Sequence, residues 1–111
     1  MTTDKFIEIF QGMQGAYGQY IIGEQAINGN KQDGKAFIKR KPVTDNLWQD
    51  HLDGKDPALG IIPINEENKC KWGCIDVDKY NLDHQKIIVN IRKKNLPLIL
   101  FRSKSGGAHI F

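Results

Sequence analysis

The spacing of apolar residues in the first half of the chain predicts two helices. Four of these residues recur at helical spacing near the N-terminus: Phe6, Ile9, Phe10 and Met13. We expect this helix to follow Thr3 as its cap and to end near residues 12–15, where two glycines lie. A second helix is expected over residues 45–52, with Thr44 as its cap and an acidic first turn.

Continuous and alternating apolar runs predict the strands. Residues 16–22 are compatible with a strand or an irregular segment, and residues 36–40 with a short strand. The intervening residues 23–35 are rich in Gly, Asn, Gln and Asp, which indicates a loop. A further apolar strand is expected over residues 58–64. It should form an antiparallel hairpin with the strand within residues 71–79, because a polar turn separates the two.

The second half of the chain has the predicted order strand, helix, strand, strand. After the strand within residues 71–79, Asp83 can cap a helix over residues 84–94, whose isoleucines are expected to face inward. Residues 98–101 form the next strand, and a turn leads from it into a last apolar run that carries His109. This order is the first part of a β-α-β-β-α-β unit, so the fold class is expected to be α+β.

Two carboxylates alternate with two apolar residues at the centre of the strand within residues 71–79. Strand side chains repeat every two residues, so Ile75 and Val77 are expected to be buried while Asp76 and Asp78 point together into a cleft. Two like charges at this spacing repel, and a site that keeps both ionised usually binds a hard cation such as Mg²⁺ or Mn²⁺. A lone D-x-D is more often a pair of solvated aspartates, so further support is needed.

The turn that follows residues 98–101 has the groups that suit a triphosphate. It contains two cations, two hydroxyls and two glycines: Arg102, Ser103, Lys104, Ser105, Gly106 and Gly107. Charged donors and unshielded glycine N–H groups are what phosphate oxygens need. Taken alone, such a turn is more often a simple hairpin, and His109 alone is more often a core histidine. The turn therefore becomes a candidate only together with the D-x-D pair.

Composition sets limits on the class of protein. A chain of 111 residues forms one domain at most, and 40% hydrophobic with 26% charged residues is typical of a globular segment. No apolar run approaches the roughly 20 residues of a membrane helix, and no signal-peptide pattern is present, so we expect no membrane partner and a cytoplasmic location. The net charge of +3 supports a polyanionic partner only weakly. The basic run Lys39, Arg40 and Lys41 is a candidate for phosphate contacts with a template strand.

The two cysteines add little to this interpretation. Cys70 and Cys74 are four residues apart, which in a strand is about 13 Å, so a direct disulfide is not expected. A zinc site would need further ligands, and His51 and His84 are the only spare histidines. We therefore favour reduced, structural thiols over a zinc site.

Two of these stretches, taken together, resemble a known family. Asp76-Val77-Asp78 resembles motif I of the archaeo-eukaryotic primase superfamily, and Gly107-Ala108-His109 resembles its small-x-His motif II. Within the superfamily, the nearest likeness is to the primase-polymerase domain of TOTE conflict systems and related phage proteins. In that domain, a segment similar to residues 59–64 precedes the D-x-D strand. The resemblance covers about residues 10–111, and the ordered combination of motifs makes it specific.

The resemblance implies an archaeo-eukaryotic-primase-like fold within a single domain, residues 1–111. Residues 1–68 would form an N-terminal α/β part, and residues 69–111 an incomplete RRM-like β-α-β-β catalytic unit. The implied activity is that of a DNA primase/polymerase, in which a 3′-hydroxyl or an initiating nucleotide attacks the α-phosphate of an NTP or dNTP. Asp76 and Asp78 would be catalytic and would bind Mg²⁺ or Mn²⁺.

The resemblance also implies the residues that bind substrate. The nucleotide-binding residues would be Arg102, Ser103, Lys104, Ser105, Gly107 and His109. His109 would be a donor to a phosphate oxygen rather than a base. Lys39, Arg40 and Lys41 would contact a DNA template. A helicase or nuclease in the same chain or operon is a further partner that the resemblance suggests.

The chain departs from the family pattern at its end. The third family motif, an apolar residue followed by a carboxylate, has no counterpart before Phe111. We therefore interpret the chain as the N-terminal portion of a larger protein, and we expect the chain on its own to be inactive. Two other functions stay open: a non-catalytic nucleic-acid-binding remnant, and a metal-dependent phosphoesterase or nuclease that uses the same aspartates. The latter would normally need more His or carboxylate ligands than the chain offers.

Overall fold

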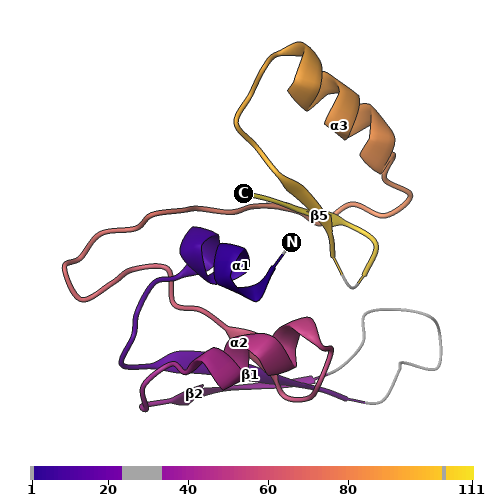
Figure 1. Cartoon of the computed structure of the whole chain (residues 1–111). Coiled ribbons are helices and arrows are strands. Elements are labelled where there is room, and N and C mark those ends of the chain that lie inside the picture. Colours follow the sequence, from indigo (N-terminus) through magenta and orange to yellow (C-terminus); the bar gives the residue numbers. More distant parts are fainter. Residues whose placement is uncertain (1, 24–33, 104) are drawn as a thin grey trace. The chain divides into compact units, whose positions relative to one another are not determined.

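A computed structural model describes residues 2–23, 34–103 and 105–111. In these residues the fold is α+β, with three helices and two three-stranded antiparallel sheets. The chain forms two compact units, Met1–Trp72 and Gly73–Phe111 (Figure 1). Most of the loop predicted over residues 23–35 lies outside the described residues. None of the helices described is both long enough and apolar enough to cross a lipid bilayer.

The first unit contains a sheet with the strand order β2-β1-β3. Its strands are β1 (Tyr17–Ile22), β2 (Gly34–Lys39) and β3 (Ala58–Gly60), and both pairs are antiparallel. The predicted hairpin between residues 58–64 and the D-x-D strand is wrong, because β3 pairs with β1 and only an isolated bridge joins Ile64 to Cys70. The glycine at position 60 suits this pairing, since Gly18 lies directly opposite it and the two backbones approach closely.

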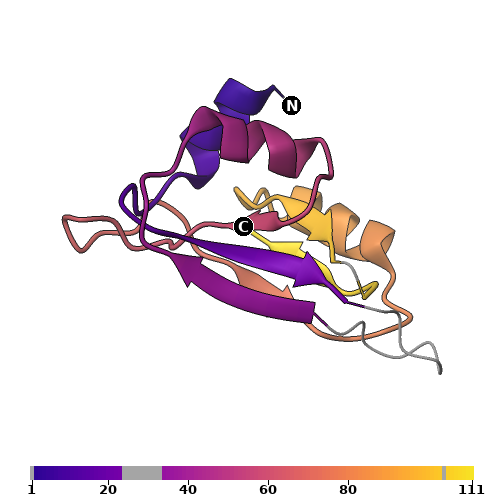
Figure 2. The same cartoon turned by 90° about the horizontal axis from the view of Figure 1, so that it is seen from below.

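Two helices cover one face of this sheet (Figure 2). They are α1 (Thr3–Phe10) and α2 (Asp45–Leu52), and both lie where the sequence predicts a helix. The ring of Phe6 packs 4.7 Å from that of Phe10 and 5.9 Å from that of Trp48. Phe10 and Trp48 are buried, so the apolar stripe of α1 belongs to the core as predicted.

The limits of α1 differ from the prediction at both ends. Thr2 rather than Thr3 is the cap, and its hydroxyl accepts a hydrogen bond from the Lys5 amide. The helix ends at Phe10 because the chain then runs along the segment at Ile62, where a side chain at Gly12 would collide with the Ile62 carbonyl oxygen. The next amide, of Met13, donates to the same oxygen at 2.9 Å. This pairing replaces a further helical turn.

The second unit contains a sheet with the strand order β4-β6-β5. Its elements are β4 (Ile75–Val77), α3 (His84–Lys93), β5 (Leu100–Arg102) and β6 (Ala108–Ile110). The predicted order of strand, helix, strand, strand is thus confirmed. Because β6 is antiparallel to both neighbours, β4 and β5 run parallel to each other with β6 between them.

The helix of the second unit begins as predicted, but one strand residue is more exposed than expected. The Asp83 carboxylate accepts a hydrogen bond from the Lys86 amide at 3.1 Å, which caps α3. The isoleucines predicted to face inward are half-buried: Ile87, Ile88 and Ile91. Ile75, predicted to be buried, is 58% exposed because β4 is an edge strand and has a neighbouring strand on one side only. The buried position of this sheet is Ala108, in the central strand.

Candidate functional site

The D-x-D strand and the strand that carries His109 are direct neighbours in the sheet. Asp76 in β4 lies opposite His109 in β6, and Val77 lies opposite Ala108. His109 Nε2 is 3.5 Å from the Oδ1 atom of Asp76. Residues 33 positions apart in the sequence, one from each candidate motif, are therefore in contact range.

Strand alternation assigns the candidate residues to two faces of this sheet. Asp76, His109 and Phe101 occupy one row across the three strands, so their side chains share a face. Val77, Ala108 and Arg102 occupy the next row and belong to the opposite face. The structure therefore brings Asp76 and His109 together, whereas it places Arg102 at the end of β5 on the other side of the sheet.

Aromatic rings adjoin His109 on its face. The ring of Phe111 lies 6.3 Å from the imidazole and 5.6 Å from the ring of Phe101, edge-on in both cases. Phe111 is held by two backbone hydrogen bonds of 2.9 Å with Ile99. The imidazole therefore has an apolar support on one side and the Asp76 carboxylate on another.

The turn between β5 and β6 is closed by its own backbone. The Ser103 amide donates to the Gly107 carbonyl oxygen, and the Gly106 amide donates to the Ser103 carbonyl oxygen, each at 3.1 Å. Gly106 has φ of 92°, a conformation that favours glycine. Ser105 is exposed. Lys104, also predicted to bind phosphate, lies outside the described residues.

Asp78 follows β4 directly and has a different neighbour from Asp76. Its Oδ1 accepts a hydrogen bond of 2.9 Å from the hydroxyl of Tyr80. Asp78 lies beyond the last residue of β4 and is exposed, and the side chain of Asp76 is 70% exposed. Both carboxylates are therefore accessible to an ion from solvent.

The donor set fits a hard, partly hydrated cation better than an ion with a full protein cage. Among the described residues, no group of three or more His, Cys, Asp or Glu side chains could hold a metal ion. Mg²⁺ commonly keeps several waters and binds through one or two carboxylates together with substrate phosphates. Asp76 and Asp78 offer the one or two carboxylates that such a site would use.

The two histidines considered for a zinc site have hydrogen-bond partners within the protein, and Cys70 and Cys74 are free thiols. His51 Nδ1 accepts a hydrogen bond of 3.1 Å from the Leu59 amide, and His84 bonds to the turn between β5 and β6. Burial raises the pKa of the Cys74 thiol above its ordinary value of 9.0, and the nearby charge of Asp76 raises this pKa further, against a smaller opposing effect of a backbone hydrogen bond from Ile110.

The predicted template-binding residues belong to the first unit. Lys39 is the last residue of β2, Arg40 and Lys41 follow it, and all three are exposed. The Lys39 ammonium lies 5.6 Å from the centre of the Phe37 ring, a cation–π contact that orients the side chain. These three cations therefore form an exposed basic group at the end of β2.

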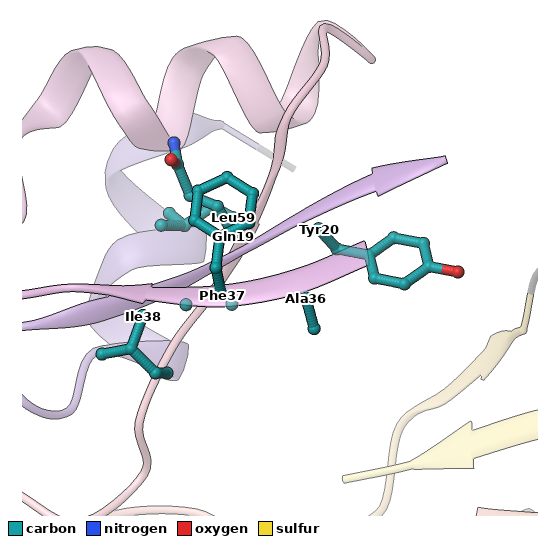
Figure 3. A pocket seen from close by; sticks show the side chains of 8 residues that line it. Gln19, Tyr20, Ala36, Phe37, Ile38 and Leu59 are labelled. Atoms are coloured by element: carbon teal, nitrogen blue, oxygen red, sulfur yellow. The ribbon is translucent and has the colours of Figure 1, made fainter. Parts of the chain in front are cut away.

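A shallow apolar pocket of about 290 Å³ lies on the sheet of the first unit (Figure 3). It is lined by Gly18, Gln19, Tyr20, Ala36, Phe37, Ile38, Leu59 and Gly60. The side chains of Ala36 and Ile38 lie on the side of the sheet away from the helices, and Ile38 is 61% exposed. None of the residues predicted to be functional lines this pocket.

Two residues near the site were missed by the sequence interpretation. Tyr80 contacts Asp78 through its hydroxyl, and His84 Nε2 lies 2.8 Å from the Gly107 carbonyl oxygen. Tyr80 lies only two positions after Asp78, so its proximity was a usable signal. His84 gave none, because its contact depends on how α3 is placed next to a turn 23 residues away.

Comparison with known proteins identifies one family. The sequence model described as the TOTE conflict system, Archaeo-Eukaryotic Primase domain, matches residues 4–111. No curated protein and no solved structure has a significant match.

Proposed function

The chain belongs to the archaeo-eukaryotic primase domain family of TOTE conflict systems, and from this premise we propose that it carries the metal-dependent site of a DNA primase/polymerase. The observation that supports this proposal most directly is the pairing of Asp76 with His109 across β4 and β6. Nucleotidyl transfer uses carboxylates that bind a metal ion and side chains that donate hydrogen bonds to phosphate oxygens, and this pairing brings one of each to the same face of the sheet.

Asp76 and Asp78 hold the metal ion in this proposal. When bound to them, Mg²⁺ or Mn²⁺ would offset the negative charge of the attacking oxygen and of the leaving pyrophosphate. The two carboxylates keep the positive charge of the metal ion on one face of the sheet, next to His109. Tyr80 limits the orientations of Asp78 through its hydrogen bond of 2.9 Å.

The turn after β5 and the start of β6 bind the triphosphate. His109 donates to a phosphate oxygen, and donors from Ser103, Lys104, Ser105 and the Gly107 backbone complete the contacts. Arg102, whose row in the sheet belongs to the opposite face from Asp76 and His109, is the predicted phosphate contact that this arrangement supports least. A primer 3′-hydroxyl, or that of an initiating nucleotide, then gives its proton to water, and its oxygen forms a bond to the α-phosphorus of an NTP or dNTP. The bond to the bridging oxygen breaks, and pyrophosphate leaves.

The proposed domain organisation follows from these roles. The elements β4, α3, β5 and β6 have a split β-α-β arrangement with an antiparallel strand in between, which supports the assignment of residues 69–111 to an RRM-like catalytic unit. Residues 1–68 form the N-terminal α/β part of the same domain. In this part, Lys39, Arg40 and Lys41 contact phosphates of a DNA template.

Calorimetry tests the metal and nucleotide assignment. The chain is titrated with a dNTP in the presence and absence of Mn²⁺, alongside the double variant Asp76→Asn, Asp78→Asn. We expect Mn²⁺ to strengthen nucleotide binding of the parent and to have little effect on the variant. Glu67→Gln, an exposed carboxylate-to-amide change in the first unit, serves as the control and should behave as the parent. Equal Mn²⁺-dependent affinity in all three proteins would refute the assignment.

A further inference from the structure

His84, the first residue of α3, is joined to the turn between β5 and β6. Its Nε2 lies 2.8 Å from the carbonyl oxygen of Gly107. A carbonyl oxygen can only accept, so Nε2 must carry the hydrogen and donate it. The side chain is half-buried. The hydrogen bond thus links the helix that follows the D-x-D strand to the turn that precedes His109.

The Gly107 carbonyl oxygen accepts two hydrogen bonds. The second donor is the Ser103 amide, at 3.1 Å. A carbonyl oxygen has two lone pairs, so His84 and Ser103 together satisfy it. Two donors from different directions fix the peptide group between Gly107 and Ala108, and therefore the direction in which the chain enters β6.

Gly107 also lies directly against the backbone of the D-x-D strand. It is buried, and a side chain at this position would collide with the carbonyl oxygen of Val77. Val77 stands between Asp76 and Asp78. A displacement of Gly107 would therefore move the turn relative to both carboxylates.

From these three contacts we propose that His84 is a positioning residue that holds the phosphate-binding turn in place against the D-x-D strand. Its donor at Nε2 keeps Gly107 seated, so that Ser103 and His109 face the site that Asp76 defines. The identification of the ligand as a nucleoside triphosphate rests on the proposed function, whereas the hydrogen bond between His84 and Gly107 does not. His84 itself contacts the turn and not the phosphates.

Three substitutions of His84 distinguish the effect of the hydrogen-bond donor at Nε2 from the effect of the imidazole ring. The amide nitrogen of His84→Gln can reach the position of Nε2, whereas that of His84→Asn reaches only the position of Nδ1, and His84→Ala has no donor. We expect the Asn and Ala variants to bind a fluorescent dNTP analogue with Mn²⁺ about three- to ten-fold more weakly, the usual effect of one lost hydrogen bond. The Gln variant should stay within about two-fold of the parent. Gln85→Ala, an exposed change in the same helical turn, is the control and should match the parent.

Amide hydrogen exchange provides a second readout that does not need a nucleotide. The Ser103 and Gly106 amides close the turn, and we expect both to exchange faster in the Asn and Ala variants than in the Gln variant. Circular dichroism establishes that all proteins are compared below their unfolding transitions. Parent-like affinity in the Asn and Ala variants would overturn the proposal. So would an equal loss in the Gln variant, because the ring and not the donor would then be responsible. A parent that binds no triphosphate while its turn amides respond as expected would refute the proposed function and, with it, the role of His84 in nucleotide binding.

Discussion

Asp76 is the residue at which several interactions of the second unit meet. It lies opposite His109, and it raises the pKa of the Cys74 thiol through its negative charge. A side chain that is 70% exposed exerts this influence only on close neighbours, because solvent screens its charge. Cys74 is therefore a reporter of the charge at position 76.

Removal of the Asp76 charge should make Cys74 more reactive. Asp76→Asn lowers the pKa of the thiol, so a larger fraction is thiolate, the form that reacts with iodoacetamide. In a Cys70→Ser background at about pH 8, we expect alkylation of Cys74 to be about two- to three-fold faster. Asp45→Asn, the same change in the first unit, is the control. An unchanged rate in Asp76→Asn would contradict the placement of the carboxylate beside the thiol.

The hydrogen bonds of Glu66 should make the stability of the first unit depend on pH. Its Oε1 accepts hydrogen bonds from the amides of Gln14 at 2.9 Å and Gly15 at 3.2 Å, and the Gln14 bond is the largest cause that lowers the pKa of Glu66 below its ordinary value of 4.5. A carboxyl group with a lowered pKa in the folded state contributes stability above the pKa of the unfolded state. That contribution is lost as the pH falls through the lower, folded-state value.

The measurement compares thermal unfolding at about pH 6 and about pH 3 in the parent and in Glu66→Gln. The parent should lose more of its midpoint temperature on acidification than the variant, which has no charge at position 66 to lose. Glu67→Gln removes a charge at the next position, whose side chain is exposed, and should follow the parent. Identical pH profiles in the parent and in Glu66→Gln would contradict this prediction.

Sequence patterns indicated the chemistry of single residues better than their burial. The alternation correctly placed Asp76 and Val77 on opposite faces, because the repeat of a strand is a local property. Asp78 lies beyond the end of β4, so its place on the face of Asp76 stays a prediction. The exposure of Ile75 could not be predicted from the alternation of residues along the strand. It depends on β4 lying at the edge of its sheet, which only the pairing of distant strands determines.

At the scale of elements, the caps of α2 and α3 offer a matched comparison. Asp83 accepts a hydrogen bond from the Lys86 amide, whereas Thr44 has the position of a cap but no side-chain hydrogen bond. Residues at this position stabilise a helix by accepting from an otherwise unpaired amide. The two caps should therefore differ in strength although the sequence predicts both.

Asp83→Ala should destabilise the protein by about 1 kcal/mol, whereas Thr44→Ala should cost only a few tenths, about 0.3 kcal/mol. Chemical denaturation of both variants provides the free energies of unfolding. Asp83→Asn keeps an acceptor at the cap and should recover most of the loss. Equal destabilisation by Asp83→Ala and Thr44→Ala would show that the hydrogen bond at Asp83 contributes nothing.

Helices were predicted more accurately than strand pairings. The bounds of α2 follow from a local cap and a local apolar spacing, and the structure has the helix at the predicted residues. The partner of β3 does not follow from local signals. A polar turn after residues 58–64 favours a hairpin with the next strand, yet Gly60 pairs with Gly18, which lies 42 positions earlier.

At the scale of the whole molecule, charge is distributed unevenly. Residues 73–111 contain seven Lys or Arg residues and three acidic residues, whereas residues 1–72 contain nine basic and ten acidic residues. Within the first unit, residues 34–44 have four basic residues and no acidic one: Lys35, Lys39, Arg40 and Lys41. Binding of a polyanion could therefore follow either the net charge of the second unit or the local charge at the end of β2.

Two triple variants of equal charge change decide between these origins. In the first, Lys39, Arg40 and Lys41 become Gln, and in the second Arg92, Lys93 and Lys94, which are exposed at the end of α3, become Gln. Each phosphate contact with a single strand contributes about 0.7 to the slope of log affinity against log salt concentration. If the residues at the end of β2 contact a template, the first variant should reduce this slope by about 2 for a labelled single-stranded DNA, and the second by much less.

The comparison is made by fluorescence anisotropy across a range of salt concentrations, because affinity at a single salt concentration cannot separate local contacts from net charge. Equal reductions in both variants would mean that binding follows net charge, and would contradict the assignment of Lys39, Arg40 and Lys41. A larger reduction in the second variant would move the phosphate contacts to the end of α3. Only a loss confined to the first variant supports a template-binding surface at the end of β2.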